Sequence, residues 1–87
     1  PSKMFEYMAF AKTIIVGVRG EAKKIVDISK AGISIEPENP TMLSKAILTY
    51  YKNKDKCNVD GLNGMTYITK NLSKEILISN MIDQVKK

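Results

Sequence analysis

The start of the chain combines a helix N-terminus with a lysine and a glutamate. Ser2 is a residue type that often caps helices, and Lys3 and Met4 occupy the turn that follows it. Free backbone N–H groups and the positive end of the helix dipole make such a terminus suitable for binding phosphate. Glu6 follows Ser2 by four residues, about one helical turn, so one ligand could contact both residues. A carboxylate accepts two hydroxyl hydrogen bonds, which suits a diol.

Composition excludes several other kinds of catalytic centre. The chain has one cysteine, Cys57, and no histidine, so a disulfide framework, a Cys/His zinc site and a histidine-based triad are all excluded. The carboxylates are dispersed along the sequence, and we therefore expect no metal site. The longest apolar run, residues 14–18, is far shorter than the roughly 20 residues that a membrane-spanning helix needs.

The net charge of +5 comes from lysines that are distributed over the whole chain. Thirteen of the fourteen cations are lysines, and Arg19 is the single arginine. Because recognition of bases and phosphates in nucleic acids usually depends on arginine, a solvated lysine-rich surface is favoured and no nucleic-acid partner is expected. The alternative is a basic helical module that binds nucleic acid, a membrane surface or another protein. Its binding to a polyanion or a charged membrane would weaken steeply with salt.

The first part of the chain alternates between helical and strand patterns. The spacing of apolar residues predicts a helix over 2–11, a strand over 13–18, a helix over 21–29 and a strand over 33–35. The β-branched run in 13–18 is typical of a strand that is buried on both faces. A strand, a helix and a second strand within about two dozen residues form a crossover, so the two strands should be parallel.

The second part of the chain is predicted to be helical to its end. An Asn-Pro pair at 39–40 supplies a cap and a proline at the first helical position, and it opens a helix over 40–52. Two further helices are expected over 59–71 and 74–86, with Ser73 as the cap of the last one. The first of these two helices is traced by the apolar residues Val59, Leu62, Met65, Ile68 and Leu72, while Gly61 and Gly64 in its first half are poor helix formers.

These elements predict an incomplete α/β sheet. Parallel sheets are stable only with several strands and with helices on both faces, so two adjacent parallel strands make a poor sheet. We therefore expect that residues 1–87 are the closing part of a doubly wound, Rossmann-like α/β domain and that the natural protein continues before Pro1. The apolar face of the first helix and the open edge of the sheet also predict self-association of the 87-residue chain.

The sequence resembles one enzyme family over essentially its whole length. The segment PSKMFEYMA, followed by Lys12-Thr13-Ile14-Ile15, is similar to the PSK..EYMA..GKP(V/I)I segment of GT4-type retaining glycosyltransferases, whose GT-B fold has two Rossmann-like domains. Further similarities follow in the order of the family: Gly20-Glu21-Ala22, Ala31-Gly32, Pro37 to Pro40, Asn63-Gly64 and Leu72-Ser73. The chain departs from the family at Ala11, Thr13 and Met65, where the family has glycine, proline and often arginine.

The resemblance implies that this is part of the C-terminal domain, which binds a nucleotide-diphosphate sugar. Glu6 would hold the ribose, and Ser2, Lys3 and Met4 would bind the diphosphate. Negative charge develops on the diphosphate as its bond to the sugar breaks, and the helix dipole with Lys3 beside it would stabilise that charge. The resemblance therefore implies neither a metal ion nor another cofactor.

The resemblance also implies a setting and partners. The acceptor, a glycan or a lipid-linked molecule, would bind to the missing N-terminal portion, so the 87-residue chain alone is expected to be inactive. The usual role of the family is cell-surface polysaccharide synthesis by bacterial enzymes of the cytoplasm, either free or loosely attached to the inner face of the membrane.

A purely structural interpretation of the same residues stays open. Glu6 could be an ordinary exposed acid that the helix dipole favours, and Lys3 could be a solvated surface lysine. Gly20 and Glu21, where the family contacts the donor sugar, could form only a turn and the start of a helix.

Overall fold

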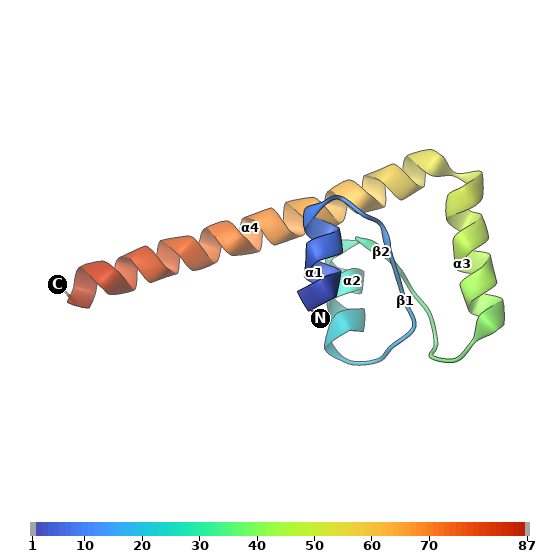
Figure 1. The fold of residues 1–87 in the computed structure, drawn as a ribbon, viewed down its shortest axis with the longest axis horizontal. Coiled ribbons are helices and arrows are strands. Elements are labelled where there is room, and N and C mark those ends of the chain that lie inside the picture. The colour runs from blue at the N-terminus through green and yellow to red at the C-terminus, as the bar shows by residue number, and fades with distance from the viewer. Residues whose placement is uncertain (1, 87) are drawn as a thin grey trace.

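A computed structural model describes the backbone of residues 2–86 and the side chains of residues 3–75, 78 and 79. Its elements, in chain order, are α1 (Ser2–Ala9), β1 (Ile14–Val16), α2 (Glu21–Ser29), β2 (Gly32–Ser34), α3 (Pro40–Lys52) and α4 (Lys54–Lys86). The first half of α4 lies against the compact part of this small α/β fold, and its second half extends away from it (Figure 1). None of the helices, over the residues described, has the length and apolar character needed to cross a bilayer.

The two strands are parallel, as the crossover pattern predicts. Ile14 pairs with Gly32 and Val16 pairs with Ser34. The Ile14 N–H donates to the Ala31 carbonyl at 3.1 Å, and the Ile35 N–H donates to the Val16 carbonyl at 2.8 Å. In a parallel sheet, alternate residues of a strand make their backbone hydrogen bonds to the same neighbouring strand. Ile14 and Val16 bond to β2, so the N–H and C=O of Ile15 between them face the other edge of β1.

The strands are shorter and less enclosed than expected. β1 has three residues rather than the six of 13–18, and Val18 is exposed. Ile14 is buried, whereas Ile15 and Val16 are only half-buried, so the expectation of burial on both faces is wrong. A two-stranded sheet has too few neighbouring elements to enclose both of its faces.

A small core holds α1 against the sheet and against α4. Its buried members are Met4, Met8, Ile14, Val26 and Ala31, and Tyr67 and Ile68 of α4 pack against them among other residues. The apolar face of α1 was expected to lack a partner, and this expectation is wrong because α4 returns across it. α1 ends at Ala9, short of the predicted residue 11, because Ala11 adopts a left-handed conformation with φ of 58°.

The C-terminal half is one helix of 33 residues, not two helices. Ser73 lies inside α4 and caps nothing, because no proline or glycine interrupts the chain between residues 71 and 75. The actual break is Asn53. Its N–H donates to the Thr49 carbonyl at 3.1 Å, and its side chain accepts from the Lys56 N–H at 3.0 Å. One residue thus ends α3 and caps α4.

Glycines form much of the buried face of α4. Val59 and Leu62 are exposed, whereas Asp60, Gly61 and Gly64 are buried, and Ile68 further along the helix packs against the core. A Cβ atom added at Gly61 would overlap the Ala11 carbonyl oxygen. At Gly64 it would lie 3.0 Å from the Ala31 Cβ atom. The absence of side chains therefore lets α4 lie directly on the neighbouring backbone.

We expect Gly61→Ala to destabilise the protein, although alanine is the better helix former. The added methyl group meets a backbone carbonyl, which cannot rotate away, and overpacking of this kind costs about 1 to 3 kcal/mol. Urea unfolding measures the change. Asn58→Ala, at an exposed position of the same helix, is the control and should be neutral or slightly stabilising. If Gly61→Ala is as stable as the wild type or more stable, α4 does not approach the Ala11 carbonyl this closely.

We also expect concentration-dependent self-association through β1, because the outward N–H and C=O of Ile15 form an open, uncharged strand edge. Ile15→Lys should reduce the weight-average mass in sedimentation at high concentration. Val18→Lys places the same charge outside the strand and serves as the control. A monomeric wild type over a wide concentration range would disprove the association.

Candidate functional site

The predicted site residues lie on the first turns of α1. Met4 and Met8 are buried and fix the helix on the core, whereas Lys3 and Glu6 are exposed. The Met4 side chain thus belongs to the core, and only its backbone N–H is suited to a ligand. Ser2 opens α1 through its backbone, and its side chain lies outside the described residues.

Three helix N-termini lie at one end of the molecule. β1 and β2 both finish at this end, and α1, α2 and α3 all begin there (Figure 1). In open α/β sheets the loops after the carboxyl ends of the strands form the usual ligand site. Lys3 and Glu6, in the first turns of α1, are therefore placed at the end of the sheet that commonly binds ligands.

The two loops at this end differ in how they open the following helix. Asn39 accepts a hydrogen bond from the Met42 N–H at 3.0 Å and so caps α3. Gly20 precedes α2 with φ of 89°, makes no side-chain cap, and has open space where a side chain would lie. The first N–H groups of α2 are therefore free of a side-chain acceptor, and a ligand can approach Gly20 closely.

An ion pair joins the two loops. Arg19 and Glu36 approach to 3.3 Å, and both side chains are largely exposed. An exposed pair of this kind contributes little to stability. Beside it lies a pocket of about 370 Å³ between the sheet and α3, lined by Ile15, Gly17, Ile35, Glu36, Glu38, Asn39, Pro40 and Leu43.

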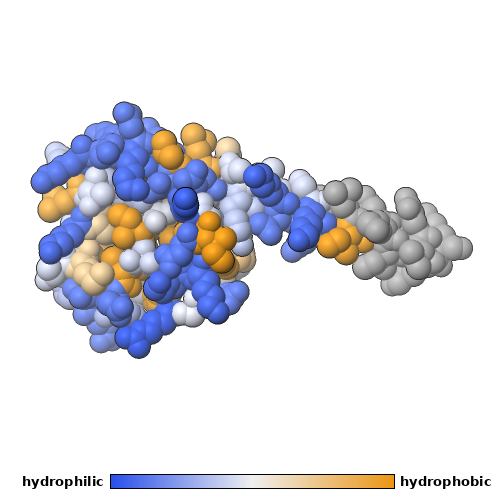
Figure 2. All heavy atoms as spheres, turned by 180° about the vertical axis from the view of Figure 1, so that it is seen from behind, coloured by the Kyte–Doolittle hydropathy of each residue, from blue (hydrophilic) through white to orange (hydrophobic). Residues whose placement is uncertain are grey.

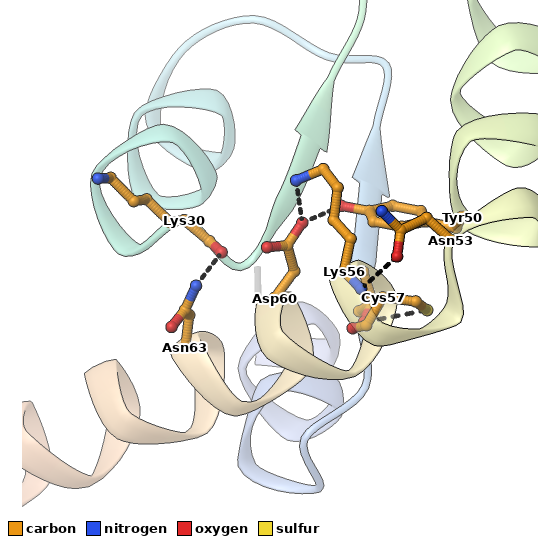
Figure 3. A network of polar contacts seen from close by, with 8 residues as sticks. Lys30, Tyr50, Asn53, Lys56, Cys57, Asp60 and Asn63 are labelled. Atoms are coloured by element: carbon orange, nitrogen blue, oxygen red, sulfur yellow. Dashed lines mark hydrogen bonds and ion pairs between the residues drawn. The ribbon is translucent and has the colours of Figure 1, made fainter.

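Sequence reasoning missed the main buried polar cluster of the described residues. Asp60 is buried, and its Oδ2 accepts hydrogen bonds from the Tyr50 hydroxyl at 2.6 Å and from the Lys56 Nζ at 3.1 Å (Figure 3). The Lys56 amine also lies 5.8 Å from the centre of the Tyr50 ring. The signal was present in the sequence, since Lys56 and Asp60 are spaced for one helix face.

This cluster and its neighbours join α4 to the rest of the fold. The Asn63 side chain donates to the Lys30 carbonyl at 3.1 Å, at the end of α2 (Figure 3). The Thr13 hydroxyl donates to the Cys57 carbonyl, and the Cys57 thiol lies 3.5 Å from the Thr13 Oγ1. The predicted helices 40–52 and 59–71 left residues 53–58 in a connector, whereas Cys57 lies in the first turn of α4 and packs against Thr13. These contacts assign the cluster a structural role.

The residues described contain no group of three or more Cys, Asp and Glu side chains that could hold a metal ion. None of the protein-family models searched matches the chain, and neither the curated proteins nor the solved structures yield a match. The geometry and the residues themselves therefore carry the functional argument.

The pKa of Tyr50 is raised above its ordinary value. Burial disfavours the phenolate, and the neighbouring Asp60 accepts the phenolic proton in a hydrogen bond and carries a negative charge. Since the folded state favours the protonated phenol, this contribution to stability is complete below pH of about 10, the ordinary tyrosine pKa. It is lost progressively as the pH rises above that value.

We expect Tyr50→Phe to lower the free energy of unfolding at pH 7 by about 1 to 3 kcal/mol, because it removes a donor from a buried carboxylate. The variant should also lose stability less steeply than the wild type between pH 9 and pH of about 11, since it has no phenol to ionise. Urea unfolding at several pH values measures both effects. The adjacent, exposed Tyr51→Phe is the matched control and should follow the wild type. Identical pH profiles of Tyr50→Phe and the wild type would refute the link between ionisation of Tyr50 and stability.

Proposed function

We propose that residues 1–87 form the closing part of the Rossmann-like donor-binding domain of a retaining glycosyltransferase with the GT-B fold. The position of Lys3 and Glu6 carries the proposal, because both side chains are exposed on the first turns of α1 at the end where β1 and β2 finish. The similarity of the PSK..EYMA segment to this family supports the same assignment.

The proposed donor is a nucleotide-diphosphate sugar. The first N–H groups of α1, those of Ser2, Lys3 and Met4, and the Lys3 amine bind its diphosphate. Glu6 accepts hydrogen bonds from the two ribose hydroxyls one turn further along the helix. Nothing in this arrangement requires the buried Met4 side chain, which serves instead to hold α1 in position.

The proposed reaction transfers the sugar to an acceptor hydroxyl. The bond between the anomeric carbon and the diphosphate oxygen breaks, and the nucleoside diphosphate leaves with the bonding electrons. The acceptor oxygen bonds to the anomeric carbon, and its proton passes to the departing diphosphate. The helix dipole and Lys3 stabilise the charge that develops on the diphosphate. The acceptor is a glycan or a lipid-linked molecule held by the N-terminal portion of the protein, and the product belongs to cell-surface polysaccharide synthesis in the cytoplasm.

In the complete enzyme, Glu6→Ala should reduce donor affinity, or kcat/KM for the donor, roughly tenfold to a hundredfold, because hydrogen bonds to the ribose are lost. The kinetic parameters for the acceptor should change much less. Glu6→Gln should be milder, since the amide keeps one acceptor oxygen. Lys3→Ala should lower kcat as well, because its contact to the diphosphate strengthens as charge develops.

A donor that contains deoxyribose separates the ribose role from a merely structural one. The wild type should discriminate strongly against this donor, and Glu6→Ala should lose most of that discrimination. If both enzymes discriminate equally, Glu6 does not contact the ribose. If the complete enzyme neither binds nor uses any nucleotide-diphosphate sugar, the proposed function itself is wrong.

A further inference from the structure

We draw no further inference here: the strongest candidate, the surface patch of Leu43, Ile47, Leu48 and Tyr51 on α3, on the side of the molecule where exposed apolar atoms are seen between hydrophilic ones (Figure 2), carries none because nothing in the structure shows what covers it.

Discussion

The close approach of α4 to the backbone of the first half of the chain is the constraint on which the rest of the fold depends. At Gly61 the helix lies on the Ala11 carbonyl, and at Gly64 it lies on the Ala31 methyl group. A two-stranded parallel sheet cannot bury its own residues. Because α4 lies so near, Tyr67 and Ile68 reach the cluster that contains Met4 and Met8. The single helix α4 therefore covers the core that further strands and helices cover in a larger α/β sheet. It also fixes α1, which carries the candidate site.

The same approach determines where α3 lies. Asn53 is the only residue between α3 and α4, so this short connection restricts the orientation of α3 relative to α4. Asp60 is one residue before Gly61, and burial of its carboxylate would be costly without partners. Tyr50 from α3 and Lys56 from α4 supply those partners and tie the two helices together. The buried face of α3 is thereby set by Tyr50 and Ala46, and Ile47, Leu48 and Tyr51 elsewhere on the helix are left exposed.

The sequence predicted the elements whose ends carry explicit signals. The bounds of α2 and α3 agree with the predicted 21–29 and 40–52, because glycine and the Asn-Pro pair mark their starts. α4 was wrongly divided into two helices, because Ser73 is of a residue type that often caps helices, and large apolar residues alone do not mark its buried face. Its buried stripe instead contains an aspartate and two glycines, whose burial depends on contacts distant in sequence.

At the candidate site, too, the sequence predicts features that depend on local residue spacing and does not predict features that depend on distant contacts. The spacing of Met4, Phe5, Met8 and Ala9 predicts one buried side of α1. Met4 and Met8 are buried as predicted, whereas Phe5 and Ala9 are exposed, as is Glu6. Its role as a ribose ligand comes from the resemblance alone, because an exposed glutamate in the second turn of a helix has no geometric feature that distinguishes it. That the N-termini of α1, α2 and α3 share one end follows from the crossover topology, which the sequence did predict.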